Sequence, residues 1–342
     1  MNHIMQEDID NIIKADIRWE KLRGCSVLIT GATGMLGGYL LRTLSELNRQ
    51  RAYGMTLYIL VRHPEKLDEA LRGQVKVICQ SVSEPIVTDA RFDYVIHAAS
   101  PASPQIMAKD PVGTIAANAL GAFYTLQAAQ RSDAKGYLYI SSREIYGQPY
   151  ADQKVFTEET YGFVDPLQAR SCYPEGKKAA ETMCVCYKEQ YGLNTKIARL
   201  AHTFGPGMSI YDGRVQADFL KNVVHHEDIL LKSDGSAIRT YTYVSDAVTA
   251  LFYVLLNSDD MVYNISSEAD TVSIRQLAQT LLDEFPERGL KLVFDIPEEA
   301  QKGTAPFTLG ILGSDKLKAL GWKPHYRLGE VLRRTVEYLE SK

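Results

Sequence analysis

The chain has 342 residues, of which 45% are hydrophobic, so it can bury a large core and form one large domain or two closely joined ones. Its formal net charge is −4 with acids and bases interspersed, which excludes a basic face for nucleic acid and a polybasic patch for a membrane. The N-terminus lacks the apolar region of a signal peptide, and five irregularly spaced cysteines exclude a disulfide framework or a zinc site, so we expect a cytoplasmic, metal-free protein.

Residues 4–22 have the spacing of an amphipathic helix, with Ile9, Ile13 and Ile17 on one stripe. This segment precedes the first predicted strand. We therefore expect residues 1–24 to form an appended helix that packs on the main domain.

A glycine-rich loop follows the first strand. Residues 27–29 are apolar, as in a buried parallel strand, and Gly31, Gly34 and Gly37 follow with G-x-x-G-x-x-G spacing. Such glycines let the backbone approach a pyrophosphate, while the N-terminus of the next helix directs its N–H groups at the phosphates. We predict a dinucleotide site whose contacts come from Gly31, Thr33, Gly34, Met35, Leu36 and Gly37.

The second strand, residues 55–61, ends where such a fold meets the adenosine ribose. An acidic residue there would bind the 2′-hydroxyl of NAD, but the chain has Arg62, which favours the 2′-phosphate of NADP. A solvated arginine at the start of a loop is the alternative. The cofactor is thus predicted to be NAD or NADP.

Further strands are predicted at residues 75–79, 94–98 and 136–140, with a helix at 114–132. The alternation of strands and helices predicts an α/β fold with a Rossmann-type, doubly wound parallel sheet over residues 25–195. Ligands bind such sheets at the carboxyl ends of the strands.

Two polar clusters lie where chemistry is expected. Tyr173 and Lys177 are four residues apart, so on a helix that begins near Pro174 they share one face. A lysine cation close to a phenol lowers its pKa from about 10, so Tyr173 could take a proton from a sugar hydroxyl as hydride leaves for the cofactor.

The second cluster, Ser142-Arg143-Glu144, follows the fifth strand. If the backbone is still extended there, Ser142 and Glu144 point the same way and Arg143 points the other way. Ser142 would then hydrogen-bond the reacting oxygen. Glu144 would be an acid or base, or simply a solvated loop residue.

Beyond residue 195 the pattern is less regular. Strands are predicted at residues 196–200, 230–232, 236–243, 261–265 and 291–294, and helices at 212–225, 274–284, 314–320 and 328–339, with a further helix capped by Val244-Ser245-Asp246. We expect residues 196–342 to form mainly a smaller, substrate-binding lobe, with some segments returning to the dinucleotide-binding domain.

Together these motifs resemble the extended short-chain dehydrogenase/reductase family of NAD-dependent epimerases and dehydratases, and are most similar to those of its UDP-glucuronate decarboxylases. The segments that carry the resemblance are the glycine loop and residues 97–104, 170–177, 212–215, 239–246 and 320–322. The resemblance implies a nucleotide-sugar substrate oxidised at C4, with Tyr173 and Lys177 as the base pair, Ser142 as the helper hydroxyl and Glu144 as a second acid or base.

The same resemblance implies further contacts. It assigns Ser81, Ala98, Ala99 and Ser100 to the cofactor, and Ser103, Arg143, His202, Arg214 and Arg239 to the substrate. Arg214 and Arg239 would contact the nucleotide diphosphate, as bidentate guanidinium geometry suits. Family members commonly dimerise through a helix pair, so a homodimer is expected.

Departures from the family pattern bear on the reaction. Arg143 replaces the serine of the decarboxylases and the aspartate of the dehydratases, His202 replaces an asparagine, and Gly207 replaces an arginine. Leu309-Gly310-Ile311 replaces the Arg-Lys-Pro segment whose arginine takes part in decarboxylation. Because Arg143 would have to turn inward against strand alternation, we expect UDP-glucuronate to be a poor substrate and a neutral nucleotide hexose to be preferred.

The predicted function is therefore hydride transfer at C4 of a nucleotide sugar, in an epimerase or a decarboxylase-like enzyme. A 4,6-dehydratase and a 4-ketoreductase are the alternatives. A non-catalytic NAD(P)-binding regulator is the alternative of another class, and the intact set of Tyr173, Lys177 and Ser142 argues against it.

Overall fold

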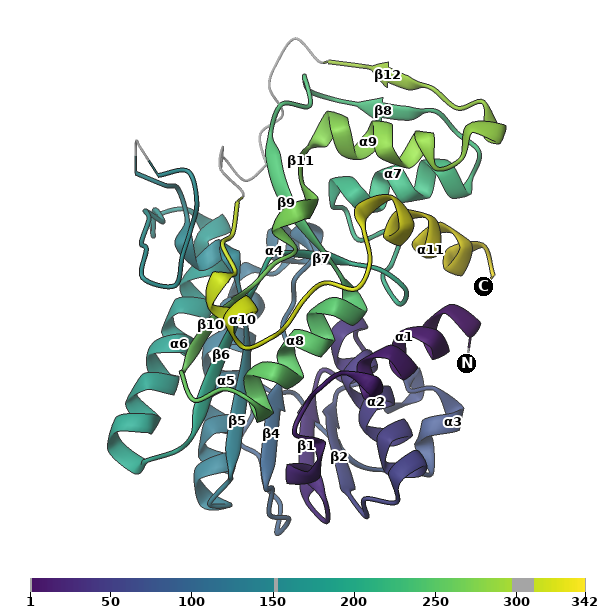
Figure 1. Cartoon of the computed structure of the whole chain (residues 1–342). Helices are drawn as coiled ribbons and strands as arrows, with labels where there is room; N and C mark the ends of the chain where they lie inside the picture. Colours follow the sequence, from purple (N-terminus) through teal and green to yellow (C-terminus); the bar gives the residue numbers. More distant parts are fainter. Residues whose placement is uncertain (1, 151–152, 297–310, 342) are drawn as a thin grey trace.

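A computed structural model describes residues 2–150, 153–296 and 311–341. Its centre is a seven-stranded sheet in which all neighbouring strands are parallel (Figure 1). In sheet order the strands are β3 (Val75–Cys79), β2 (Thr56–Val61), β1 (Ser26–Thr30), β4 (Tyr94–His97), β5 (Gly136–Ser142), β6 (Thr195–Leu200) and β10 (Val262–Ile265). This order reverses between β1 and β4, which confirms the predicted doubly wound fold and locates its ligand crevice.

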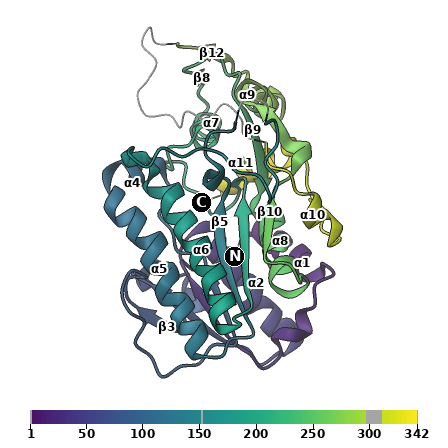
Figure 2. The ribbon, with the colours of Figure 1, turned by 90° about the vertical axis from the view of Figure 1, so that its left-hand side faces the viewer.

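Helices cover both faces of this sheet, which is why its inner strands are almost entirely buried. On one face lie α2 (Met35–Arg51) and α8 (Val244–Leu256), and on the other lie α5 (Pro111–Arg131) and α6 (Cys172–Tyr191), which pack against each other (Figures 1 and 2). The side chains of β1 alternate between the two layers. Val27 and Ile29 pack into the hydrophobic core beneath α2 and α8, and Leu28 packs into the core beneath α5 and α6.

A smaller lobe stands above the carboxyl ends of the strands (Figure 1). It contains a three-stranded sheet, β11-β9-β7, and a two-stranded sheet, β12-β8. Its strands are β7 (His202–Phe204), β8 (Ile229–Leu231), β9 (Ile238–Tyr243), β11 (Thr271–Ser273) and β12 (Leu292–Phe294). Its helices are α7 (Val215–Val224), α9 (Ile274–Asp283) and α11 (Leu328–Glu340). Between these segments the chain returns to the larger domain as α8, β10 and α10 (Asp315–Ala319).

The remaining elements are short, apart from the N-terminal helix. They are α1 (His3–Lys14), α3 (Glu69–Arg72), α4 (Pro104–Lys109) and the 3₁₀ turns η1 (Trp19–Leu22), η2 (Pro64–Lys66), η3 (Arg143–Tyr146), η4 (Ala169–Ser171), η5 (Glu268–Asp270) and η6 (Pro286–Arg288). Within the described ranges, no helix is long and apolar enough to cross a membrane.

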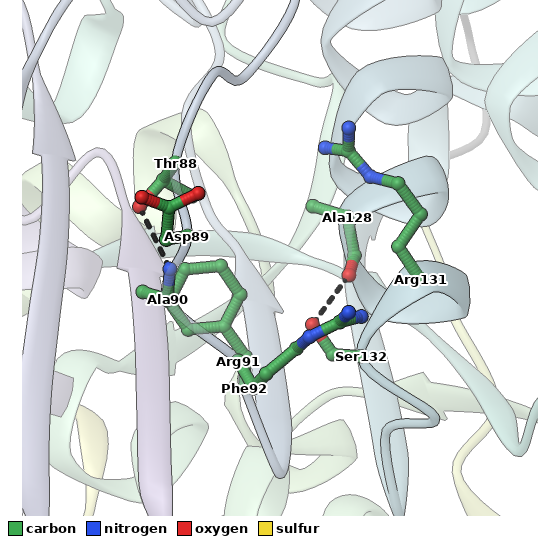
Figure 3. A pocket seen from close by; sticks show the side chains of 8 residues that line it. All are labelled: Thr88, Asp89, Ala90, Arg91, Phe92, Ala128, Arg131 and Ser132. Atoms are coloured by element: carbon green, nitrogen blue, oxygen red, sulfur yellow. Dashed lines mark hydrogen bonds between the residues drawn. The ribbon is translucent and has the colours of Figure 1, made fainter.

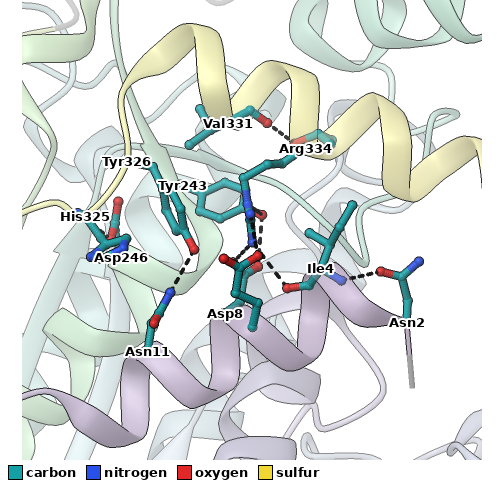
Figure 4. A network of polar contacts seen from close by, with 12 residues as sticks. Asn2, Ile4, Asp8, Asn11, Tyr243, Asp246, His325, Tyr326, Val331 and Arg334 are labelled. Atoms are coloured by element: carbon teal, nitrogen blue, oxygen red, sulfur yellow. Dashed lines mark hydrogen bonds and ion pairs between the residues drawn. The ribbon is translucent and has the colours of Figure 1, made fainter.

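Helix α1, at the N-terminus, packs against α11 near the C-terminus. Asp8 is fully buried and accepts a hydrogen bond from the hydroxyl of Tyr39 at 2.9 Å. It also accepts hydrogen bonds from the hydroxyl of Tyr243 at 2.9 Å and from Arg334 of α11 at 2.7 Å (Figure 4). A buried carboxylate is tolerated because it is paired and fully hydrogen-bonded. The N-terminal helix is therefore an integral part of the packing between the two lobes.

Several predicted boundaries are wrong. The helix predicted over residues 4–22 ends at Lys14, because Ala15 has extended dihedrals (φ −60°, ψ 150°), and residues 19–22 form a separate 3₁₀ turn. The predicted cap at Ser245 and Asp246 is also wrong. Tyr243 is the N-cap of α8, and Asp246 lies inside its first turn and accepts the N–H of His325.

Candidate active site

The glycine loop lies between β1 and α2, against the loop that follows β4. Gly31 has φ +70°, and a Cβ on it would lie 2.8 Å from the backbone of Ala99. A Cβ on Gly37 would lie 2.2 Å from the carbonyl oxygen of Gly31. Only glycine fits at these two positions, so the loop folds back tightly in front of the N-terminus of α2.

This loop fits the pyrophosphate of a dinucleotide. Gly34 is the N-cap of α2 and provides no side chain to cap it, and Thr33 and Gly34 are exposed. The first N–H groups of a helix have no partner within the helix, and in α2 these include the N–H groups of Met35 and Leu36. The residues present therefore suit the predicted cofactor.

Two residues that sequence analysis did not single out hold the two loops together. The Thr30 hydroxyl accepts the N–H groups of Ala98 and Ala99 at 3.1 and 3.0 Å and contacts His97 Nδ1 at 2.8 Å. Burial, together with the charge of Lys177, lowers the pKa of His97 to about 3. His97 is therefore neutral and acts as a structural acceptor for Thr30.

The other predicted cofactor residues lie around this crevice. Ser100 donates a hydrogen bond to Asn118 of α5 at 2.8 Å. Arg62 follows β2 and is exposed, and Ser81 lies two residues beyond β3, the neighbouring strand. Arg62 and Ser81 thus flank the strand ends at which an adenosine ribose is expected.

Ser142, Tyr173 and Lys177 come together at the carboxyl end of β5. Ser142 is the last residue of that strand, and α6 begins at Cys172 rather than near Pro174, so Tyr173 and Lys177 lie in its first two turns. Lys177 Nζ donates to the carbonyl of Ile140 at 2.7 Å and lies 5.7 Å from the centroid of the Tyr173 ring.

The expectation that Lys177 lowers the pKa of Tyr173 is not met in the protein alone. Burial and then the charge of Glu144 raise the pKa of Tyr173, while a hydrogen bond with Ser142 lowers it. Burial also lowers the pKa of Lys177 to about 7, against the charge of Glu181. Desolvation thus outweighs charge pairing and favours the neutral forms of both groups.

The predicted alternation of side chains after β5 is also wrong. The strand stops at Ser142, whose hydroxyl accepts the N–H of Glu144 at 3.2 Å, and the next residues turn into η3. As a result Arg143 points inward and is only 4% exposed. Glu144 forms an ion pair with Arg170 at 2.9 Å.

The predicted substrate residues form one cluster. Arg143 Nη1 lies 3.3 Å from His202 Nε2 on β7, and burial together with the charges of Arg143, Arg239 and Arg214 lowers the pKa of His202 well below its usual value. Arg214 pairs with Asp212 at 3.1 Å and donates to the carbonyl of Ala102. Ser103 donates to the carbonyl of Asp212 at 2.9 Å, which brings it to the same cluster.

Comparison with known proteins places this geometry in a family. The sequence model of the NAD dependent epimerase/dehydratase family matches residues 27–266. The chain belongs to this family. UDP-glucuronic acid decarboxylase 6 of Arabidopsis thaliana is 30% identical over 307 residues, which cover 90% of this chain and 86% of that protein.

Solved structures of the epimerase type share its fold. The UDP-glucose 4-epimerase of Thermotoga maritima, solved with UDP-glucose, gives a TM-score of 0.77 at 24% identity, over 92% of this chain and 99% of that one. The UDP-glucuronic acid 4-epimerase of Bacillus cereus, solved with UDP-glucuronic acid and NAD, gives 0.75 at 18% identity, with 92% and 99% covered. These structures confirm the predicted fold. The family model and the decarboxylase relative confirm the prediction of an NAD-dependent enzyme of the epimerase/dehydratase family.

Sequence analysis of this epimerase/dehydratase family member missed a buried network beneath the site. Glu181, one helical turn after Lys177, accepts hydrogen bonds from Ser141 at 2.5 Å and from Arg199 of β6 at 2.7 Å. Arg199 also donates to the hydroxyl of Tyr146 at 2.8 Å. The network fixes both ends of the Ser142–Tyr146 turn, and its only sequence signal is a charged residue at a buried position of each element.

Other features lie outside the site. The hollow drawn in Figure 3 is lined by residues 88–92 and by the end of α5, so it lies near the amino end of β4, opposite the crevice. Leu309 and Gly310, which replace the family's Arg-Lys segment, lie outside the described residues. Within residues 2–150, 153–296 and 311–341, no group of three His, Cys, Asp or Glu side chains is placed to hold a metal ion.

Proposed function

We propose that the chain binds a nucleotide sugar and oxidises its C4 hydroxyl by hydride transfer to NAD or NADP, as an epimerase or a decarboxylase-like enzyme. The observation that carries the proposal is the contact of Ser142 with Tyr173, one helical turn before Lys177, beside a glycine loop shaped for a dinucleotide. The relatives named above, which act on UDP-glucose or UDP-glucuronic acid, support the substrate class.

Each residue has a chemical task in this proposal. Ser142 holds the C4 oxygen, and Tyr173 takes its proton, as a general base within hydrogen-bond reach does. Lys177 supplies positive charge to the phenolate that forms. The residues around Gly31–Gly37 and Ala98–Ser100 would hold NAD or NADP, which would supply the hydride acceptor.

The resulting C4 ketone could react in three ways, by epimerisation, decarboxylation or dehydration. Return of the hydride to the opposite face inverts C4, which needs no group beyond Ser142, Tyr173 and Lys177. Loss of CO₂ requires a carboxylate at C6. The ketone at C4 would make this group a β-keto acid, which loses CO₂ readily. A 4,6-dehydratase would need an acid and base pair, and Arg143 stands where one of the two would be, so we rank dehydration lower.

Glucose and glucuronic acid linked to UDP, dTDP, GDP and CDP provide the test, with products followed by mass and cofactor reduction by absorbance. Tyr173→Phe should abolish hydride transfer while the Kd for the cofactor is kept, because the phenol serves the chemistry and the loop serves binding. Loss of a positioned base costs about 10²–10⁴ in rate. A Tyr173→Phe enzyme that still reduces its cofactor at the wild-type rate would rule this proposal out.

We also propose a homodimer that pairs α5 and α6 with their copies. Helices α5 and α6 lie side by side (Figure 2). Large apolar side chains stay exposed on them, namely Val112, Ile115, Leu120 and Phe123 of α5 and Val185 of α6. Such a patch marks an association surface. Light scattering of the purified protein should give twice the chain mass; a single-chain mass at micromolar concentration would contradict the dimer.

We also propose a cytoplasmic location. The free state of all five cysteines supports a reducing compartment.

A further inference from the structure

Tyr139 is a fully buried aromatic residue of β5 that lies against the side chain of Lys177. Side chains alternate along a strand, so Tyr139 and Ser141 share the face of β5 that meets α6. Lys177 of α6 reaches the same place. Its Nζ lies 4.8 Å from the centroid of the Tyr139 ring and donates to the carbonyl of Ile140, the next residue of the strand, at 2.7 Å.

The hydroxyl of Tyr139 does not account for this contact. It is buried and has no hydrogen-bond partner within residues 2–150, 153–296 and 311–341. Burial raises the pKa of Tyr139 well above its usual value, so the phenol stays neutral and cannot pair with Lys177 as an anion. Tyr137, two residues earlier on the same face, instead shares a hydrogen bond with Thr125 of α5 at 2.9 Å. What Tyr139 offers to Lys177 is therefore the face of its ring.

His97 of β4 supports this ring. The imidazole stacks on it with the centroids 5.6 Å apart and the planes inclined by 22°, and its Nδ1 contacts the Thr30 hydroxyl at 2.8 Å. Because its pKa is lowered to about 3, His97 is neutral and adds no second cation beside the ring. The stack thus connects the support of Lys177 with the loops expected at the cofactor.

The other charged and titratable groups around Lys177 come from several elements. They are Tyr173, Glu181 and Cys184 on α6, Arg199 on β6 and Glu144 in η3. Burial raises the pKa of both Tyr173 and Cys184, which favours their neutral forms, and Asn118, which α5 places against Gly176, is uncharged. Glu144 is paired with Arg170, and Glu181 with Arg199. The charge of Glu181 opposes the effect of burial on Lys177 without cancelling it.

The face of an aromatic ring is negative and attracts a cation, and the attraction is strongest where water is excluded. Lys177 is almost completely buried, so this condition is met. We propose that Tyr139 is a positioning residue, which through the face of its ring keeps Lys177 charged and on the Ile140 carbonyl, beside Tyr173. This inference rests on the proposed function, in which the charge of Lys177 stabilises the phenolate of Tyr173.

Two measurements test this role. The pKa of Lys177 is measured by NMR titration of the purified protein with lysine labelled at ¹³Cε, and the signal is assigned by its absence from Lys177→Met. Hydride transfer is measured as cofactor reduction with the nucleotide sugar that the panel of four nucleotides selects. Tyr139→Leu removes the ring and should lower the pKa of Lys177 by roughly 0.5–1.5. It should also slow hydride transfer roughly 3- to 30-fold.

Two further variants separate the ring face from packing. Tyr139→Phe is the matched control, because it keeps the ring and removes only a hydroxyl without a partner, so the pKa of Lys177 and the rate should stay at the wild-type values. Pentafluorophenylalanine at position 139 keeps the shape of the ring but reverses the charge of its face. It should lower the pKa and the rate as Tyr139→Leu does, and it decides the question if the leucine variant does not fold.

The outcomes distinguish the two proposals. If the pKa of Lys177 is the same with phenylalanine and with pentafluorophenylalanine at position 139, Tyr139 only fills space and its proposed role is overturned. A lower pKa without slower hydride transfer overturns its part in the reaction and leaves the proposed function standing. If the wild-type protein transfers hydride from none of the nucleotide sugars, the proposed function fails, whereas the titration still decides whether the ring holds the charge of Lys177.

Discussion

Substitution of Gly37 tests the glycine loop most directly. In Gly37→Ala, the new methyl group would lie 2.2 Å from the carbonyl oxygen of Gly31 and 2.7 Å from its carbonyl carbon, so the loop and α2 must move apart. Overpacking of this kind costs roughly 1–3 kcal/mol. Because the atoms that move are those expected at the pyrophosphate, the Kd for NAD or NADP should rise roughly 5- to 150-fold. Isothermal titration calorimetry with both cofactors measures this change.

The next residue of the same helix provides a matched control. A Cβ on Gly38 would lie 3.5 Å from the carbonyl oxygen of Ala32, an ordinary contact. Alanine is also a better helix former than glycine by roughly 1 kcal/mol. Gly38→Ala should therefore keep the wild-type Kd and melt at the same or a higher temperature. Equal cofactor affinities for the two alanine variants would refute the reasoning about Gly37.

Three further predictions use other parts of the crevice. Arg62→Ala should raise the Kd for NADP far more than that for NAD, and equal effects would show that Arg62 is merely solvated. Thr30→Val leaves two loop N–H groups without their acceptor and should lower the free energy of unfolding by about 2 kcal/mol in urea; Thr43→Val should be neutral or stabilising, since its buried hydroxyl has no partner among the described residues. Burial lowers the pKa of Lys177 from 10.5 to about 7, so between these values the unfolded chain binds more protons and the stability contributed by this group rises with pH. Lys177→Met should thus be more stable than the wild type at about pH 6 and lose that advantage by about pH 10; an advantage that does not shrink would count against the buried, half-neutral lysine.

Local patterns were enough to predict the sheet and part of the site. The strand predicted at residues 75–79 is β3 residue for residue, because three of its five residues are the β-branched Val75, Val77 and Ile78, which favour strands. Tyr173 and Lys177 were paired correctly in space because a separation of four residues on a helix fixes a shared face whatever the tertiary structure does.

Features that depend on contacts between distant parts of the chain could not be predicted from local sequence patterns. The direction of Arg143 depends on where β5 ends, at the point where the hydroxyl of Ser142 caps η3, and its contact with His202 joins residues 59 apart in the chain. The pair of Glu181 and Arg199 joins residues 18 apart on different elements. Periodicity carries no information about such contacts.

The pKa values of the proposed catalytic pair, Tyr173 and Lys177, also have a tertiary origin. Lys177 lies one helical turn before a carboxylate, yet its pKa falls, because burial outweighs the opposing charge of Glu181, which is itself paired with Arg199 and hydrogen-bonded by Ser141. Lys177 donates its hydrogen bond to the Ile140 carbonyl inside the protein. Burial there disfavours both the ammonium form of Lys177 and the phenolate form of Tyr173 when either is charged alone. A negative charge that forms on Tyr173 would raise the pKa of Lys177, 5.7 Å from its ring, and protonation of Lys177 would stabilise that charge in turn. We therefore expect the pH dependence of the proposed hydride transfer to belong to the pair rather than to either residue.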